Sequence, residues 1–262
     1  MIYLSFDTEE FDVPREYGVE YDTLKEGMFV SQYGIERILQ ILDEESVKAT
    51  FFCTSNFVLN ATDLVRRIQR EGHEIASHGC DHWAPKKGDA FRSKSIIEDS
   101  LGIAITGFRH PRMFPVNNKE LSESGYLYNA SLNPTIIPGR YSNLSLSRIP
   151  WIEDNVVQIP VSVSPHFRIP MFWLSLHHFP LNIYFTISKR IIKHDGSFNT
   201  YFHPWEFYPL NDSPELKIPY IIRKRSGKDM CMRLNRFIDF QKQQGERFGT
   251  YNEYANEILK HY

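Results

Sequence analysis

The sequence contains few cysteines and no long apolar run, and both scarcities restrict what the protein can be. Its 3 cysteines, Cys53, Cys80 and Cys231, are odd in number and far apart, so they form neither a disulfide framework nor a Cys-x-x-Cys pair. This cysteine usage favours a reducing compartment. No run of 18 apolar residues is present, so we expect no membrane span.

The sequence also lacks a large net charge and an export signal. Its formal net charge of −2 gives no reason to expect nucleic acid or an anionic membrane as a partner. The first residues read M-I-Y-L-S-F-D and contain no basic segment, no long apolar segment and no cleavage site. We therefore expect a soluble, cytoplasmic protein.

Strand-like and helix-like segments alternate from the first residues onward. Strands are predicted at 2–6, 47–53 and 73–77, and amphipathic helices at 33–44 and 62–70. This β-α-β-α-β order is typical of a parallel sheet or barrel. Because α/β barrels reach this length undivided, we predict a single domain over residues 1–262.

Two histidines follow the third predicted strand at a spacing that suits a metal ion. His78 and His82 are four residues apart, so a helical turn or a tight loop places both imidazoles on one side. Two imidazoles and one carboxylate make an open three-ligand metal site. Asp7 and Glu9 follow the first strand and point the same way if the chain stays extended. Functional residues of parallel folds gather at the C-terminal ends of strands, so we predict a metal site there.

Two neighbouring carboxylates, Glu10 and Asp12, are expected to have a different role. Together with Asp7 and Glu9 they place four carboxylates within six residues, which repel one another when buried without a cation. For Glu10 and Asp12 we therefore favour a solvated loop.

Two further polar residues end predicted strands. Arg109 follows a strand predicted at 103–108, and the His110-Pro111 bond after it favours an extended chain that can aim the guanidinium. His203 ends an aromatic strand and is followed by Pro204 and Trp205, which makes it a candidate proton donor on the same rim.

Residues 165–192 differ from the rest in being apolar, aromatic and interrupted by prolines. We interpret them as an insertion packed over the barrel, either a lid or a lipid-facing patch. Within them, His177 and His178 are expected to be packing or surface residues. Residues 221–228 are predicted to form a basic loop that is solvated or contacts an anionic group of a substrate.

Taken in order, the motifs resemble those of polysaccharide deacetylases, the NodB-homology proteins of carbohydrate esterase family four. They are D-T-E at 7–9, S-H-G-C-D-H at 77–82, G-F-R-H-P at 107–111 and Y-F-H-P-W at 201–205, within a resemblance that runs from residue 2 to about 255. The resemblance implies a distorted (β/α)7 barrel with its site at the C-terminal rim. It also implies one divalent metal ion, usually zinc.

The resemblance also implies a role for each matched residue. His78 and His82 become metal ligands, Asp7 the base that takes a proton from water, and Arg109 the residue that orients Asp7. His203 becomes the acid that protonates the leaving amine, on the side opposite the base.

Two more residues of the matched motifs are expected at the substrate. The backbone N–H groups after Pro111, near Arg112, are expected to hold the oxyanion. Trp205, next to the acid motif, is predicted to contact the sugar.

The chain departs from the family pattern in two places. The commonest pattern has two adjacent aspartates after the first strand, whereas Thr8 follows Asp7 here, so Glu9 is predicted as the third ligand and Glu10 is the next candidate. The family also supplies a carboxylate and a tryptophan that tune the acid histidine. The segment 151–154 is only a loose counterpart, which leaves the partner of His203 open.

The sequence therefore favours a metal-dependent hydrolase that removes an N-acetyl group from a sugar of a glycan or glycan precursor, nucleotide-linked or lipid-linked. One alternative is a hydrolase of cyclic amides or ureides on the same fold. The other is a catalytically inactive carbohydrate-binding protein, which would follow if Glu9 could not reach the histidine pair. The oligomeric state stays open.

Overall fold

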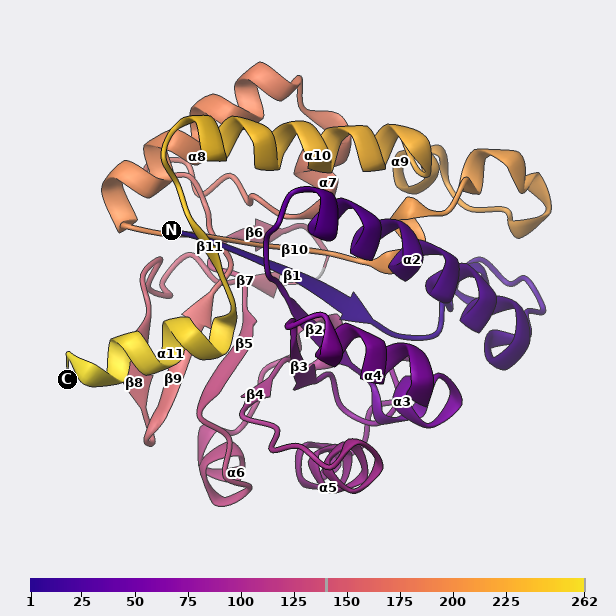
Figure 1. The fold of residues 1–262 in the computed structure, drawn as a ribbon, viewed down its shortest axis with the longest axis horizontal. Helices are drawn as coiled ribbons and strands as arrows, with labels where there is room; N and C mark the ends of the chain where they lie inside the picture. The colour runs from indigo at the N-terminus through magenta and orange to yellow at the C-terminus, as the bar shows by residue number, and fades with distance from the viewer. Residues whose placement is uncertain (140, 262) are drawn as a thin grey trace.

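A computed structural model describes residues 1–139 and 141–261 and shows an α/β fold (Figure 1). The strands are β1 (Ile2–Thr8), β2 (Thr50–Cys53), β3 (Glu74–Ser77), β4 (Gly107–Phe108), β5 (Tyr128–Leu132), β6 (Ile136–Ile137), β7 (Tyr141–Ser142), β8 (Trp151–Glu153), β9 (Val156–Pro160), β10 (Phe198–Phe202) and β11 (Phe248–Gly249). The α-helices are α1 (Val13–Glu16), α2 (Met28–Glu44), α3 (Ser55–Asn60), α4 (Thr62–Arg70), α5 (Asp89–Leu101), α6 (Asn118–Glu123), α7 (Trp173–His178), α8 (Leu181–Asp195), α9 (Tyr220–Arg223), α10 (Lys228–Gln243) and α11 (Tyr251–Lys260).

The main sheet curls into a barrel of parallel strands. Its order is β10-β1-β2-β3-β4-β5-β9-β8, in which each neighbouring pair up to β9 is parallel and β8 lies antiparallel on β9. The curl closes where the chain after β9 meets β10, because Ser162 N donates to Asn199 O over 3.0 Å. The side chain of Ser162 accepts a second bond from Asn199 N, at 2.9 Å. The predicted distorted (β/α)7 barrel is thereby confirmed.

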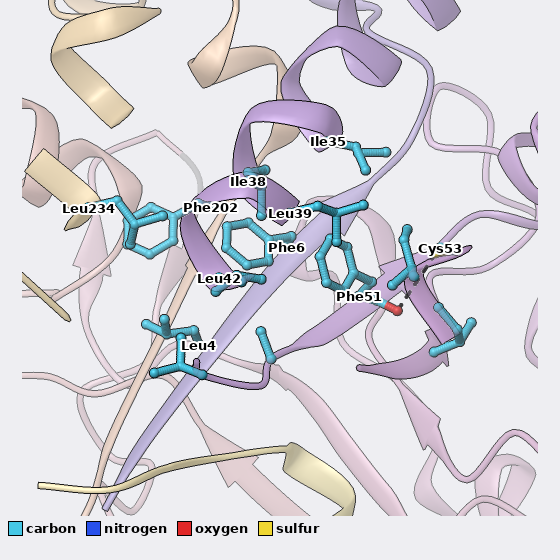
Figure 2. Packing of buried hydrophobic residues seen from close by; sticks show 14 of the residues in the cluster. Leu4, Phe6, Ile35, Ile38, Leu39, Leu42, Phe51, Cys53, Phe202 and Leu234 are labelled. Carbon is cyan, nitrogen blue, oxygen red and sulfur yellow. Dashed lines mark hydrogen bonds between the residues drawn. The ribbon is translucent and has the colours of Figure 1, made fainter. Parts of the chain in front are cut away.

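The alternation of β1 separates the helix-facing core from the barrel interior. Leu4 and Phe6 pack against α2 and α10 in a large apolar cluster, which Figure 2 shows from close by. Tyr3, one position along, packs inside the barrel with Phe52, and α11 contributes Tyr251 to the same cluster. Successive side chains of a strand point to opposite faces. Asp7 therefore continues the inward row of Tyr3 and places a carboxylate at the C-terminal end of the barrel.

Several predicted elements match the structure closely, and a few differ. The helix predicted at 62–70 is α4 with the same bounds, and the long helix predicted at 33–44 begins earlier, at Met28. The strand predicted at 103–108 is reduced to β4. In the described part of the chain no helix is long and apolar enough to cross a membrane.

The aromatic segment 165–192, expected as an insertion over the barrel, belongs to the barrel itself. It contains α7 and most of α8, and α8 is the helix that connects β9 to β10. Its buried face, which includes Tyr184 and Ile191, joins the main core. Part of the aromatic composition therefore serves packing, as Tyr184 shows. The basic segment expected as a loop at 221–228 contains the end of α9 and the first residue of α10.

Candidate active site

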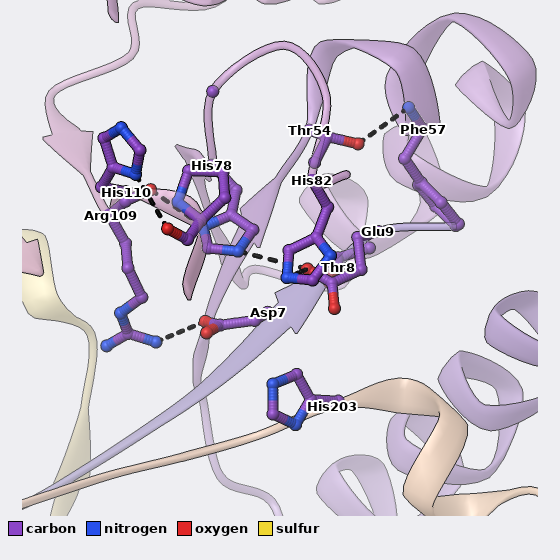
Figure 3. A network of polar contacts seen from close by, with 12 residues as sticks. Asp7, Thr8, Glu9, Thr54, Phe57, His78, His82, Arg109, His110 and His203 are labelled. Carbon is purple, nitrogen blue, oxygen red and sulfur yellow. Dashed lines mark hydrogen bonds and ion pairs between the residues drawn. The ribbon is translucent and has the colours of Figure 1, made fainter. Parts of the chain in front are cut away.

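The polar residues predicted from four strand ends meet at one end of the barrel. Asp7 lies at the C-terminal end of β1 and Glu9 directly follows that strand, while His78 follows β3, Arg109 follows β4 and His203 follows β10. Figure 3 shows the guanidinium of Arg109 directed at Asp7, with His203 approaching from the opposite side. Parallel strands leave their C-terminal ends on one edge, which is why residues far apart in sequence meet here.

Glu9, His78 and His82 form the cluster expected for a metal ion. Their ligand atoms all lie within 4.8 Å of one another. Glu9 Oε2 is 3.2 Å from His78 Nε2 and 3.6 Å from His82 Nε2. Glu9 is 2% exposed, so water does not satisfy its charge. Glu10, the other candidate for the carboxylate ligand, is not part of this cluster.

The hydrogen bonds of the two imidazoles determine which ring nitrogens face Glu9. His78 Nδ1 lies 2.8 Å from the backbone oxygen of Arg109, which can only accept, so Nδ1 carries the proton. His82 Nδ1 lies 2.8 Å from Asp12 Oδ2 and likewise donates. The two Nε2 atoms then face Glu9, where each can offer a lone pair to a cation. Outer partners of this kind orient metal-bound histidines.

The donor set fits a divalent cation. Glu9 Oε2 is buried without a hydrogen-bond donor among the described residues. A carboxylate oxygen and two imidazole lone pairs that converge in a buried site repel one another unless a cation or a proton lies between them. Two nitrogen ligands and one carboxylate are a set that zinc accepts in an open site.

The pKa of His82 reflects the same electrostatics in the absence of a cation. Burial lowers the pKa of this imidazole, but the charge of Glu9 and the hydrogen bond that the imidazole donates to Asp12 together raise it to about 9. A proton therefore occupies the position that a cation would take.

Asp7 is held by a fully buried arginine. Arg109 Nη1 lies 2.5 Å from Asp7 Oδ1 and 2.9 Å from Ser5 Oγ. Its other nitrogens donate to Ala130 O and to the hydroxyl of Tyr251. Burial alone would raise the pKa of Asp7, but the Arg109 charge outweighs it and lowers that pKa below its ordinary value. Asp7 is therefore ionised, as a base must be.

His203 is paired with a carboxylate from its own motif. Its Nδ1 lies 2.9 Å from Glu206 Oε1, and its backbone N–H donates to the same oxygen at 2.6 Å. Burial lowers the pKa of His203, but the bond to Glu206 and the nearby charges of Glu206, Glu9 and Asp7 raise it above its ordinary value. A raised pKa keeps the imidazole protonated, as a general acid requires.

The segment 151–154, the loose candidate for the partner of His203, does not reach the site. Trp151 and Glu153 belong to β8, the antiparallel edge strand of the sheet, and Glu153 Oε2 accepts from Asn118 Nδ2 at 3.1 Å. Glu206 takes the expected place because the 3-10 helix Pro204–Phe207 returns its side chain to His203.

The expectation that Glu10 and Asp12 lie in a solvated loop is wrong for both residues. Asp12 is 4% exposed and holds His82. Glu10 is 7% exposed and accepts from Thr54 Oγ1 at 3.2 Å. Burial, with the charges of Glu9 and Asp81, raises the pKa of Glu10 to about 7. The repulsion is relieved because a histidine pairs with one carboxylate and the other gains affinity for a proton.

A cavity of about 310 Å³ opens over these residues. Arg112 and Trp205, the predicted substrate contacts, both line it. Arg112 has a φ of 61° and forms an ion pair with Glu16 at 2.8 Å, and its Nε is buried without a partner among the described residues. Trp205 is 3% exposed and stacks on His203 with a centroid distance of 4.9 Å. The remaining walls are mostly apolar and include Val13, Met113, Ile137, Tyr141, Phe172, Trp173, Leu174, Tyr201, Ile221 and Ile222.

Sequence reasoning missed the residues that hold the predicted ones in place. These are Asp12 on His82, Glu206 on His203, and Ser5 and Tyr251 on Arg109. Glu206 had a local signal, because a glutamate three residues after the histidine and two after a proline can return to it in one turn. The contacts of Tyr251, across the barrel, have no sequence signal.

Comparison with known proteins agrees with this geometry. Residues 1–120 match the family model described as polysaccharide deacetylase. A peptidoglycan deacetylase from Helicobacter pylori is 27% identical over 120 residues, which cover 42% of this chain and 41% of that protein. A chitooligosaccharide deacetylase from Rhizobium leguminosarum bv. trifolii is 46% identical over 107 residues, covering 37% of this chain and 47% of that protein. The matches thus span less than half of these relatives.

Solved structures share the fold over nearly the whole chain. A putative polysaccharide deacetylase from Mycobacterium smegmatis superposes with a TM-score of 0.70 at 17% identity, covering 99% of this chain and 90% of that one. An allantoinase superposes with a TM-score of 0.63 at 15% identity, covering 97% of this chain and 88% of that one. A family-four pseudoenzyme from Bacillus anthracis superposes with a TM-score of 0.54 at 14% identity, covering 97% of this chain and 65% of that one. The part of the chain that matches the polysaccharide deacetylase model, residues 1–120, includes Asp7, Glu9, His78, His82 and Arg109.

Proposed function

We propose that the protein is a metal-dependent hydrolase that removes an N-acetyl group from a sugar of a glycan or glycan precursor. The observation that carries this proposal is the Glu9–His78–His82 cluster, which lies at the same end of the barrel as an arginine-bound aspartate and a glutamate-bound histidine. A binding protein needs neither an oriented base nor an oriented acid. The deacetylases among the relatives support the same reaction class.

The residues divide the chemistry among them. A divalent cation, with zinc as the first candidate, would be held by Glu9, His78 and His82 and would supply Lewis acidity toward the acyl carbonyl and the attacking water. Asp7, kept ionised by Arg109, accepts the proton of that water.

The acid completes the reaction on the other side. His203, whose Nδ1 is tied to Glu206, has Nε2 left to protonate the departing amine. The products are acetate and a free amino sugar. The buried Nε of Arg112 is a donor available to the substrate.

The cavity indicates the size of the group that is processed. A volume of about 310 Å³ suits one acetamido sugar rather than a long stretch of polymer. Ile221, one of its walls, is exposed, and so is Ile136, which precedes the wall residue Ile137. We propose that the sugar is terminal and is attached to an apolar carrier, as in a lipid-linked precursor.

The two alternatives receive less support. The inactive carbohydrate-binding protein was predicted for a chain in which Glu9 cannot reach the histidines, and here its Oε2 is 3.2 Å from His78 Nε2. The cyclic amide hydrolase shares its fold with the allantoinase, and that likeness concerns the fold alone.

The test combines metal content with product analysis. Wild-type protein should bind about one equivalent of zinc and release acetate from N-acetyl sugars. His78→Ala should lose both, whereas His166→Ala should lose neither because His166 lies on a separate groove beside α8. Release of product from cyclic amides alone would select the first alternative. Absence of metal in zinc-supplemented wild type would select the second.

A further inference from the structure

A second buried histidine shares the carboxylate that holds the acid. His177, on α7, and Glu206 are both 0% exposed, and His177 Nε2 lies 2.9 Å from Glu206 Oε2. The other oxygen of Glu206 is the one bound to His203. Glu206 therefore lies between two imidazoles, one at the cavity and one behind it.

The hydrogen bonds determine where the protons lie. His177 Nδ1 is 2.7 Å from the backbone oxygen of Lys224, which can only accept, so Nδ1 carries a proton. If Nε2 carried none, its lone pair would face a carboxylate lone pair at 2.9 Å in a site without water. A second proton must therefore lie between His177 and Glu206.

The groups around the pair favour a charged imidazole with a charged carboxylate. Glu206 Oε1 accepts two N–H groups from His203, which stabilises the ionised form of this carboxylate. The ring of His177 meets the edge of Trp173 at 5.7 Å, and Arg225 donates to the backbone oxygen of His177 rather than to its ring.

We infer that His177 is a doubly protonated positioning residue that holds Glu206 and sets the acidity of His203; its catalytic consequence rests on the proposed function. An imidazolium on one oxygen of Glu206 partly offsets the negative charge that the other oxygen presents to His203. The charges of Asp7 and Glu9 act on His203 from the cavity side. The charges of Glu206 and His177 act on it from the opposite side. His203 thereby stays acidic enough to release its proton to the amine.

Two substitutions move the pKa of His203 in opposite directions. His177→Gln keeps an N–H donor to Glu206 but removes a positive charge, so the pKa of His203 should rise. Glu206→Gln removes the negative charge, so the same pKa should fall. His178→Gln is the matched control, because His178 is the neighbour on α7 whose Nε2 contacts Ile221 O.

The experiment is a pH titration of the full-length, zinc-loaded protein carrying ¹⁵N-labelled histidine, followed by NMR. Wild-type His177 should show two protonated ring nitrogens, and the pKa of His203 should decrease in the order His177→Gln, wild type, Glu206→Gln. The control should match wild type. A neutral His177 ring in the wild-type protein would overturn the inference. This observation requires variants only for assigning the histidine signals. An unchanged pKa of His203 in a folded His177→Gln protein would also overturn the inference.

This measurement needs no substrate, so it separates the inference from the proposed function. An imidazolium at His177 in a protein that releases no acetate from any sugar leaves the proton assignment standing and removes the proposed reaction. Where acetate is released, the alkaline limb of kcat/KM should move to higher pH in His177→Gln and to lower pH in Glu206→Gln. Equal loss of kcat in both variants without a shifted limb would mean that His177 only supports the fold.

Discussion

Asp12 fixes the orientation of His82: its Oδ2 lies 2.8 Å from Nδ1 of the imidazole, so the opposite nitrogen faces Glu9. Removing the carboxylate frees the ring to rotate. We expect Asp12→Ala to weaken zinc affinity by about 10–100-fold, as loss of a partner behind a metal-bound histidine typically does. Competition with a chromophoric chelator measures this. Glu20→Ala, which removes an exposed charge of the same sign, should leave the affinity unchanged.

Zinc binding should release protons, because the ligand His82 has a pKa of about 9 in the metal-free protein. At about pH 7.5 most of these imidazoles are protonated and must lose a proton when the cation enters. Calorimetry in buffers of different ionisation enthalpy should therefore give close to one proton per zinc. A value near zero in wild type, equal to that in His82→Gln, would contradict the assignment.

The stability of the metal-free protein should depend on the same group. The pKa of His82 is raised above its unfolded value of about 6.5, so its stabilising contribution is complete below about pH 6.5 and is lost as the pH rises through about 9. Thermal unfolding in chelator should show the Tm falling over that range more steeply in wild type than in His82→Gln. If Tm fell equally steeply with pH in wild type and His82→Gln, His82 would not be the group responsible.

Substitution of Arg109 should mainly lower stability, whereas substitution of Asp7 should mainly lower activity. Arg109→Met leaves the buried Asp7 charge unpaired and should destabilise the protein by about 3–5 kcal/mol. Asp7→Asn keeps a polar group at Arg109 and should retain zinc while kcat/KM falls by about 100-fold or more. Urea unfolding and acetate release measure the two effects. Loss of zinc from Asp7→Asn would place Asp7 among the ligands instead of the base.

Gly34 sets the distance between α2 and the acid motif. A Cβ at this position would lie 1.8 Å from the backbone oxygen of Pro204, directly after His203. We expect Gly34→Ala to push residues 203–207 away from α2, costing about 1–3 kcal/mol and lowering kcat more than zinc affinity. Gln40→Ala, on the exposed side of the same helix, is the control. Unchanged kcat in Gly34→Ala would show that the motif moves without affecting His203.

Features that depend on local periodicity could be predicted from the sequence. The alternation from Ile2 to Phe6 predicted β1, and the spacing of His78 and His82 predicted a metal cluster that the structure completes with Glu9. Both follow from the geometry of one strand or one loop. The roles assigned to these residues as ligands, base and acid remain predictions for the experiments above.

Features that depend on pairing across the barrel could not be predicted in this way. Glu10 and Asp12 appeared too repulsive to bury, and only their contacts with Thr54 and His82 explain why they are buried. The segment 165–192 is interpreted from its sequence as an insertion because it is aromatic and interrupted by prolines, but these prolines fall before α7 and between α7 and α8. In each case the deciding partner is distant in sequence.

The order of strands along the chain also affects how the protein is made. All three residues of the candidate metal cluster precede residue 83, and they lie on or after β1 and β3, which both pair with β2. The other edge of β1 pairs with β10 and β11, which are synthesised much later. Contacts between distant residues form late because long loops must close first. A ribosome-bound chain that has exposed only its first half therefore already contains all three ligands. On the proposed function, the three metal ligands are therefore synthesised well before His203, the proposed acid.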